Sequence, residues 1–304
     1  MKKVLITGGT GMLGTALIRY LVSKEIRVTL ISRPGSKRLD NVPKSPLVDI
    51  VECDLKNLLS LKEKLNKDYD TFFHFAWDGT FGEQRNDMYM QNNNIKATLE
   101  AVELANHLGC KTFLGAGSQA EYGRVDGIKL SGLTPTNPET GYGIAKLCAG
   151  KMSKIVCEKY GIKHVWVRIL STYGPLDGAH TMVMSAITGM KDGGCISCTK
   201  GEQMWDYLYC EDAARALYLA AEKGKDGAVY PIGSGEARPL KEYISIIRDQ
   251  IDTKRHIGFG EVPYYDKQVM YLCADIEELT NDTGFVPEIS FEEGIKKTME
   301  WCRG

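Results

Sequence analysis

The sequence has no large excess of charge of either sign and no long apolar run. Its 304 residues carry a formal net charge of −1 at pH 7, so neither a nucleic acid nor a membrane surface is indicated as a partner. No apolar stretch is long enough to span a bilayer, and the first apolar run, residues 4–6, is too short for a signal peptide. We expect a cytoplasmic protein of one large domain or two smaller ones.

Clustered metal ligands and paired cysteines are also missing. The nine cysteines are an odd number scattered along the chain, which is typical of reduced thiols rather than of a disulfide framework. Cys195 and Cys198 form the only close pair, with no second pair or histidines at ligand spacing. We interpret this pair as part of a β-strand and expect no metal site.

Short β-type runs and helical patterns alternate through the first half of the chain. The expected strands are residues 4–6, 27–31, 48–53, 71–75, 111–114 and 164–169. The expected helices are residues 13–23, 59–66, 92–108 and 142–160. This alternation predicts an α/β fold, a Rossmann-type, doubly wound parallel sheet with helices on both faces.

The second half has a looser pattern. Glycine and proline become frequent, and shorter strands are expected at residues 207–209, 229–232 and 269–274. Helices are expected at residues 212–222, 240–251 and 291–302. We predict a dinucleotide-binding domain over residues 1–172 and a smaller α+β substrate-binding part over residues 173–304, with strands free to cross back between them. That part is expected over the carboxyl edge of the sheet, where ligands bind in such folds.

Residues 7–14 form a glycine-rich loop between the first strand and the first helix. Gly8, Gly11 and Gly14 allow a tight turn, close approach to a pyrophosphate and packing of helix against strand. Met12 and Leu13 begin the helix, whose first N–H groups and positive dipole end favour phosphate. An ordinary loop is the alternative, but the strand–loop–helix context favours a dinucleotide site.

The second expected strand ends without the acidic residue that an NAD site usually places about 20 residues after the glycines. Ser32 and Arg33 stand there instead, followed by Lys37 and Arg38. A hydroxyl and a guanidinium suit a 2′-phosphate, so NADP(H) is favoured over NAD(H). The alternative is that Arg33 is a solvated loop charge. Asp54 and Leu55 follow the third strand, where an adenine-contacting pair is expected.

Tyr142 and Lys146 lie four residues apart and would share one face of a helix. An ammonium beside a phenol favours the phenolate, which suits proton transfer in carbonyl–alcohol redox chemistry. The same spacing occurs once more, in Tyr20 and Lys24. That second pair falls on the helix after the glycine loop, away from any substrate cleft, so the first pair is the candidate.

Taken together, these motifs resemble the extended short-chain dehydrogenase/reductases, the family of nucleotide-sugar epimerases, dehydratases and ketoreductases. The resemblance covers nearly the whole chain. Further matching segments are residues 74–77, 94–98, 134–138, 168–175 and 205–212. It implies that Phe75 and Ala76 lie under the nicotinamide, with Trp77 beside them, and that Asn94 belongs to the asparagine segment near the cofactor.

The resemblance also implies roles for three residues. Ser118 would polarise the sugar carbonyl or alcohol, Tyr142 would relay the proton, and Lys146 would bind the nicotinamide ribose and lower the tyrosine pKa. The chemistry of hydride transfer agrees with these roles, since it needs a group that moves the hydroxyl proton and a donor that holds the developing alkoxide. The cofactor performs the redox step itself.

The chain departs from the family pattern after the serine. Related 4,6-dehydratases carry an acidic pair where this chain has Gln119 and Ala120, so dehydration is not favoured. Glu121 comes one residue too late. We interpret it as a solvated or structural carboxylate, with a substrate contact as the alternative.

The substrate end departs as well. Ser171 replaces a phosphate-binding asparagine, and Trp205 replaces an arginine that commonly binds the diphosphate. Lys200, Lys267 or His180 would then bind the diphosphate, or the ligand is anchored in another way. The candidate substrate contacts are Trp77, Gln119, Ser171 and Trp205.

The sequence thus predicts an NAD(P)-dependent enzyme that acts on a nucleotide-activated sugar by hydride transfer at a ring carbon, with C4 expected. A 4-epimerase and a 4-ketoreductase both remain open, and the rival from another class is a non-catalytic cofactor sensor or interaction protein. The helices at residues 92–108 and from residue 142 are expected to pair with their copies in a homodimer, as is common in the family.

Overall fold

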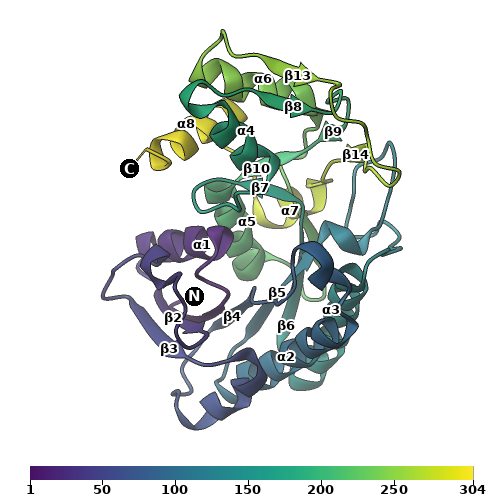
Figure 1. Ribbon diagram of the computed structural model, residues 1–304. Coiled ribbons are helices and arrows are strands. Elements are labelled where there is room, and N and C mark those ends of the chain that lie inside the picture. Colours follow the sequence, from purple (N-terminus) through teal and green to yellow (C-terminus); the bar gives the residue numbers. More distant parts are fainter. Residues whose placement is uncertain (304) are drawn as a thin grey trace.

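A single parallel sheet forms the centre of the computed structural model, which describes residues 1–303 (Figure 1). Its seven strands run in the order β11-β6-β5-β4-β1-β2-β3. They are β1 (Lys3–Thr7), β2 (Arg27–Ser32), β3 (Val48–Glu52), β4 (Thr71–His74), β5 (Thr112–Ser118), β6 (Lys163–Ile169) and β11 (Val229–Ile232). The predicted Rossmann-type α/β fold is confirmed, and the order reverses at β1, the switch point where ligands bind in such sheets.

Helices cover both faces of this sheet (Figure 1). On one face α1 (Met12–Ser23) packs against α5 (Cys210–Lys223), and on the other α2 (Met88–His107) packs against α3 (Gly141–Tyr160). Alternation along β1 explains the two cores, because Val4 and Ile6 enter the first and Leu5 enters the second. Both faces of the strand are therefore apolar.

One expected helix takes another form. Residues 59–66 were expected to be α-helical, but the segment is a run of 3₁₀ turns, η2 (Leu55–Glu63), interrupted at Asn57. Leu55, Leu58 and Leu61 recur every three residues, and Leu58 and Leu61 are buried. That spacing matches the three-residue period of a 3₁₀-helix, so the leucines share one buried face.

The remaining chain forms a smaller lobe of short strands and helices above the carboxyl edge of the sheet (Figure 1). Its paired strands are β7 (Ser171–Tyr173) with β10 (Tyr207–Tyr209), β9 (Met204–Trp205) with β12 (Arg238–Pro239) and β14 (Tyr271–Leu272), and β8 (Ile196–Cys198) with β13 (Ile257–Phe259). Its helices are α4 (Met182–Met190), α6 (Leu240–Ile251) and α8 (Phe291–Trp301), whereas α7 (Glu277–Thr283) packs against α5 and β11 beside the sheet. Elsewhere in residues 1–303, the shorter 3₁₀ turns are η1 (Leu39–Asn41), η3 (Gly82–Asn86) and η4 (Gln119–Glu121) in the first half of the chain and η5 (Lys191–Gly193) after α4.

The boundary expected at residue 172 stays a prediction. The chain enters the lobe after β6 and comes back to the sheet through α5 and β11, where Val229 pairs with Trp166. Cys195 and Cys198 lie at β8, as the β-strand interpretation expected. All nine cysteines are free, and none of the helices within residues 1–303 is long and apolar enough to cross a membrane.

Candidate active site

The loop between β1 and α1 has the close backbone packing that glycine permits. Gly8 has a φ of +74°, and a Cβ there would lie 2.6 Å from the backbone nitrogen of Ala76. Gly14 lies against the backbone of Gly8 and Gly9, so a side chain would push α1 away from the loop. A Cβ on Gly11 would meet no atom closer than 3.9 Å. The backbone at Gly11 is therefore open to a ligand.

A cleft of about 420 Å³ extends from this loop along the ends of β1 to β4. Among the residues that line it are Gly8, Gly11, Ser32, Arg33, Asp54, Leu55, Phe75, Ala76 and Trp77. The structure thus brings together most of the residues that the sequence assigned to the cofactor. The cleft lies at the switch point of the sheet, which is the usual binding place in open α/β folds.

The side chains of Met12 and Leu13 point away from this cleft. Leu13 packs against the core under α1, and Met12 lines a separate cavity. Both are in the first turn of α1, directly after its N-cap Gly11. The N–H groups of a first helical turn have no partner inside the helix, so these residues can contribute to a phosphate site through their backbone.

The rim of the cleft beyond β2 is positively charged. Ser32 is buried at the strand end, and Arg33 and Arg38 are exposed at the cleft. Neither guanidinium has a hydrogen bond or ion pair within residues 1–303. Glu52 is the nearby acid, and its carboxylate accepts a hydrogen bond from the backbone of Gly35 at 3.3 Å. The two arginines are free to meet an anionic ligand.

Ser118 stands at the last position of β5 and is fixed by the turn that follows. Its hydroxyl accepts a hydrogen bond from the backbone N–H of Ala120 at 3.2 Å. The Glu121 carboxylate accepts one from the backbone N–H of Ser118 at 2.9 Å. These two bonds form a capping box, which holds both the backbone and the hydroxyl of Ser118 in one orientation.

Glu121 is fully buried, so it is a structural carboxylate rather than a solvated one. Besides Ser118, it accepts hydrogen bonds from the Trp166 indole at 3.0 Å and from the Arg168 guanidinium at 2.8 Å. Both partners come from β6, the neighbouring strand. The carboxylate therefore ties the end of β5 to β6, and its partners satisfy the buried charge.

Tyr142 and Lys146 lie on the first turns of α3, whose N-cap Thr140 accepts a hydrogen bond from the backbone of Gly143 at 3.1 Å. The Lys146 ammonium donates to the backbone oxygen of Ala116 at 2.6 Å. It lies 3.8 Å from the centre of the Trp77 ring and 5.8 Å from the centre of the Tyr142 ring. The two side chains share one helix face, as their spacing predicts.

The pKa shifts of Tyr142 and Lys146 differ from the expectation that the lysine lowers the pKa of the tyrosine. Burial lowers the pKa of Lys146 to about 7, although Glu121 opposes this shift. Burial raises the pKa of Tyr142, while the Ser118 hydroxyl and the Arg85 charge act to lower it. The predicted lowering by Lys146 does not dominate, because a fully buried lysine loses much of its preference for the charged form.

The segment after β4 is held by side-chain amides. Asn94 donates to the backbone oxygen of Asp78 at 2.9 Å and accepts from its N–H at 3.0 Å. The indole of Trp77 donates to Gln91 at 2.8 Å. Asn94 was a candidate cofactor residue, but its amide is occupied by the loop, so it shapes the wall of the cleft from behind.

His74 is buried beneath the same loop. Its ring nitrogens lie 2.9 Å from the Thr7 hydroxyl and 3.4 Å from the Thr98 hydroxyl. Burial, with a smaller effect of the Lys146 charge, lowers the pKa of His74 to about 3. The imidazole is therefore neutral near pH 7 and links β1 to α2 without adding charge to the site.

Sequence comparison decides the family. Residues 4–233 match the NAD dependent epimerase/dehydratase family. The chain belongs to this family. The trifunctional UDP-glucose 4,6-dehydratase/UDP-4-keto-6-deoxy-D-glucose 3,5-epimerase/UDP-4-keto-L-rhamnose-reductase of Arabidopsis thaliana is 28% identical over 327 residues, which cover 99% of this chain and 47% of that protein. The chain thus spans about half the length of this relative.

Two solved structures of the family share the fold. The UDP-N-acetylglucosamine 4-epimerase of Methanobrevibacter ruminantium, in complex with UDP-N-acetylmuramic acid, has a TM-score of 0.90 at 23% identity, with 99% of this chain and 98% of that chain covered. The dTDP-glucose 4,6-dehydratase of Streptomyces venezuelae, solved with NAD bound, has a TM-score of 0.85 at 21% identity, with 99% and 97% covered. Epimerases and dehydratases are both among the neighbours, so the comparisons do not separate these reactions.

Two of the departures from the family pattern turn out to be bonded to each other. The indole of Trp205 donates to the hydroxyl of Ser171 at 2.8 Å, joining β9 to β7. Gln119 is half-buried at the start of η4, next to Ser118. Neither Trp205 nor Ser171 is ionisable, so the pair supplies no charge to a diphosphate, and the indole N–H is already used within the pair.

The other candidate anion ligands are spread over the lobe. Lys200 and Lys267 are exposed. His180 is exposed as well, and its ring lies 3.8 Å from that of Phe81, centre to centre. This contact joins the loop after β7 to the loop after β4. None of the three lines the cleft beside the glycine loop.

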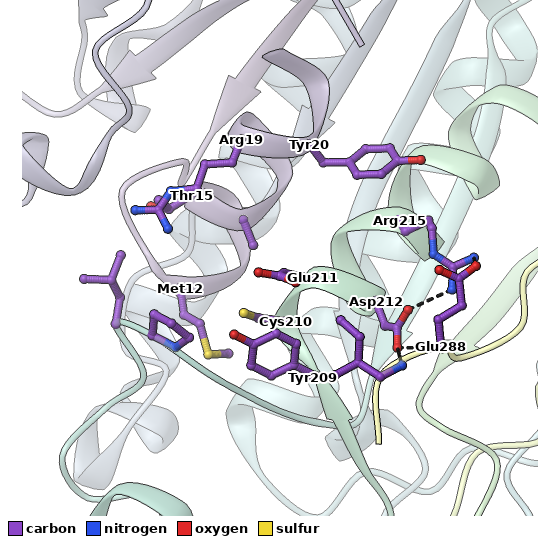
Figure 2. Close-up of a pocket in the computed structure, with 14 residues that line it drawn as sticks. Met12, Thr15, Arg19, Tyr20, Tyr209, Cys210, Glu211, Asp212, Arg215 and Glu288 are labelled. Carbon is purple, nitrogen blue, oxygen red and sulfur yellow. Dashed lines mark hydrogen bonds and ion pairs between the residues drawn. The ribbon is translucent and has the colours of Figure 1, made fainter. Parts of the chain in front are cut away.

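A separate cavity of about 310 Å³ lies between α1 and α5, and Figure 2 shows its lining. None of the three candidate catalytic residues lines it. Asp212 pairs with Arg215 at 2.7 Å, and Arg215 pairs with Glu288 at 3.1 Å. Arg215 pairs with both carboxylates, and we assign no chemistry to this cavity.

Sequence reasoning missed Arg85. Its guanidinium carbon lies 4.5 Å from the centre of the Tyr142 ring. The residue belongs to η3, in the loop between β4 and α2, far from Tyr142 in the sequence. No local spacing relates the two residues, so only the folded chain reveals the contact.

Proposed function

We propose that this protein is an NAD(P)-dependent enzyme that transfers hydride at a ring carbon of a nucleotide-activated sugar, with C4 as the expected carbon. The observation that carries the proposal is the position of Ser118, Tyr142 and Lys146 at one edge of the sheet, beside a cleft of about 420 Å³. A non-catalytic sensor is not favoured, because all three residues are present and the Lys146 ammonium joins the helix of Tyr142 to β5, the strand that ends at Ser118.

In this proposal, side chains of the protein transfer the proton and stabilise the charge that develops. Tyr142 takes or gives the proton of the sugar hydroxyl, and Ser118 holds the oxygen where negative charge develops. Lys146 stabilises charge in the buried site and is placed to bind a ribose hydroxyl. The cofactor, when bound, supplies or accepts the hydride.

Epimerase and ketoreductase chemistry use these residues differently. In an epimerase, Tyr142 removes the hydroxyl proton as the carbon loses its hydride to the cofactor, and the keto sugar turns over. Tyr142 then returns the proton to the oxygen as hydride reaches the opposite face of the carbon, which inverts its configuration. In a ketoreductase, Tyr142 only donates. The 4-epimerase among the solved neighbours supports the first, and the cationic rim at Arg33 supports the second through its fit to NADPH.

Dehydration is the least supported reaction. Gln119 and Ala120 carry no ionisable group where related dehydratases have acids. The next carboxylate, Glu121, already accepts hydrogen bonds from Ser118, Trp166 and Arg168. A carboxylate bound in this way cannot move to a sugar carbon without leaving buried partners unsatisfied.

For the cofactor, we propose a preference for NADP(H) within a family described as NAD dependent. Arg33 and Arg38 are both at the rim next to Ser32, and no acid follows β2 directly. A guanidinium binds a 2′-phosphate through paired, charge-assisted hydrogen bonds. An acid in this position would have favoured the free 2′-hydroxyl.

The decisive experiment is a turnover assay on the purified protein. Nucleotide released by denaturation identifies any retained cofactor, and UDP-, CDP-, GDP- and dTDP-sugars are then tested with and without added NADPH. Turnover without added cofactor indicates an epimerase, and stoichiometric oxidation of NADPH with a keto sugar indicates a reductase. Loss of water from the sugar would contradict the proposal, as would no reaction with any of these classes.

We also propose a homodimer through α2 and α3. Ile144, Met152 and Ile155 are exposed at 53%, 41% and 66% and lie along one side of α3, together with Cys148. Their spacing of three to four residues gives an apolar stripe on the outside of the helix. Sedimentation of the purified protein tests this proposal, and a single-chain mass at micromolar concentration contradicts it.

A further inference from the structure

The segment that carries Arg85 is docked on the start of α3. The backbone N–H of Gly141 donates to the side-chain oxygen of Asn86 at 3.0 Å. A Cβ on Gly141 would lie 3.0 Å from the backbone oxygen of Arg85 and 2.7 Å from the sulfur of Met88. The chain around η3 thus packs directly against the residue before Tyr142, and this packing fixes the backbone position of Arg85.

The Arg85 guanidinium has one neighbour on the chain besides the tyrosine ring. It donates to the backbone oxygen of Thr80 at 3.3 Å and has no carboxylate partner within residues 1–303. The side chain is half-buried. A cation over an aromatic ring is attracted to it, and the attraction grows when the phenol loses its proton, because negative charge then spreads into the ring.

Lys146 acts in a different place. Its ammonium is held by Ala116 and by the Trp77 ring, and it is the more distant of the two cations from the centre of the Tyr142 ring, at 5.8 Å compared with 4.5 Å for Arg85. Arginine stays protonated at any pH at which the protein is folded, whereas a buried lysine gives up its charge readily. The permanent charge next to the phenol is therefore that of Arg85.

We propose that Arg85 is a positioning residue of the proton relay, whose guanidinium holds the Tyr142 ring in place and stabilises negative charge on its oxygen alongside Lys146. The role rests on the proposed function, because it is defined by the proton that Tyr142 transfers. The direction of the titration agrees, since the Arg85 charge lowers the pKa of Tyr142 against the effect of burial.

The first test needs no substrate. Tyrosine labelled with carbon-13 at Cζ reports each phenol by NMR, and the Tyr142 signal is assigned by its loss in Tyr142→Phe. We expect Arg85→Met to raise the midpoint of the Tyr142 titration by about one pH unit, and Arg85→Lys to raise it less. Arg124→Met is the matched control, because Arg124 is paired with Glu139 on the surface near the start of α3. An unchanged midpoint in Arg85→Met overturns the proposal.

The second test separates positioning from general stability. With a nucleotide sugar whose hydroxyl is oxidised, in the forward or the reverse reaction, Arg85→Met should lower kcat at neutral pH by roughly tenfold. The loss should shrink at higher pH, and Arg85→Lys should restore most of the rate. A loss that is equal at every pH overturns the proposal, since it reports a merely structural role. If the wild type turns over no sugar nucleotide, the proposed function fails, and the NMR titration alone decides the role of Arg85.

Discussion

The cofactor half and the smaller lobe build their ends of the site in different ways. In the cofactor half, parallel strands end at one edge, and backbone contacts at Gly8 and Gly14 shape the cleft. In the lobe, sheets of two or three strands present side chains, and Trp205 and Ser171 bond to each other. Backbone geometry tolerates few residue types, whereas a pair of side chains can be exchanged without changing the fold. Chemistry is therefore easier to infer for the first region than substrate identity for the second.

The largest expected effect comes from a substitution that removes the candidate proton relay beside the cofactor half. Tyr142→Phe removes only a hydroxyl, and we expect turnover to fall by roughly 10²- to 10⁴-fold because the relay is lost. Cofactor affinity, measured by fluorescence titration, should be retained. Tyr20→Phe is the matched control, since Tyr20 belongs to the other tyrosine–lysine pair of the chain. Similar turnover in both variants would contradict the assignment.

A second test breaks the link between strands β5 and β6. Glu121→Gln removes a charge that faces the buried Arg168, and we expect the free energy of unfolding to fall by about 3 kcal/mol. Glu139→Gln is the comparison, because Glu139 forms a partly exposed pair with Arg124 and should change stability by at most about 1 kcal/mol. Denaturant unfolding of the three proteins measures the difference, and equal losses would refute a special role for Glu121.

A third change concerns the cofactor rim. Arg33→Ala removes one of two cations at the end of β2, so we expect the Kd for NADPH to rise roughly tenfold and that for NADH to change little. Arg27→Ala serves as the control at the opposite end of the same strand, where the side chain is exposed. Isothermal titration with both cofactors measures the four affinities, and parallel losses for NADPH and NADH would rule out a 2′-phosphate contact.

The smallest expected effect is in the lobe. Trp205→Phe removes the hydrogen bond to Ser171 and should reduce stability by about 1 kcal/mol. Ser171→Ala in that background should add almost nothing, since the partner is already gone. Trp301→Phe, at an exposed position of α8, is the control. Additive losses from the first two substitutions would show that the bond contributes nothing.

The central fold could be predicted from the sequence because buried parallel strands are visible as apolar runs between helical patterns. Strands β1 to β6 lie where they were expected, and β5 extends further, to Ser118. The lobe was less predictable. The strand expected at residues 269–274 is only β14, and α4 and α7 were not expected. α4 packs against α6 in the lobe, and α7 packs against α5 and β11 beside the sheet. A local sequence pattern contains neither contact.

The candidate site follows the same division. The spacing of Tyr142 and Lys146 pointed to that pair, and the family resemblance implied the role of Ser118. Arg85 reaches the tyrosine only through the docking of η3 on α3. The hydrogen bond between Trp205 and Ser171, at positions where related proteins have anion ligands, is also a tertiary contact. Neither residue on its own indicates the other.

The buried carboxylate of Glu121 also bears on the assembly of the sheet during folding. It bonds to Ser118 in the turn that it shares with that serine and to Trp166 and Arg168 on the next strand, so its buried charge is fully paired only when β6 has joined β5. In a partly folded chain, in which β6 is not yet in the sheet, the Glu121 carboxylate would lack both of its β6 partners. Incomplete assembly of the sheet should therefore be costly at the turn that carries the candidate catalytic serine.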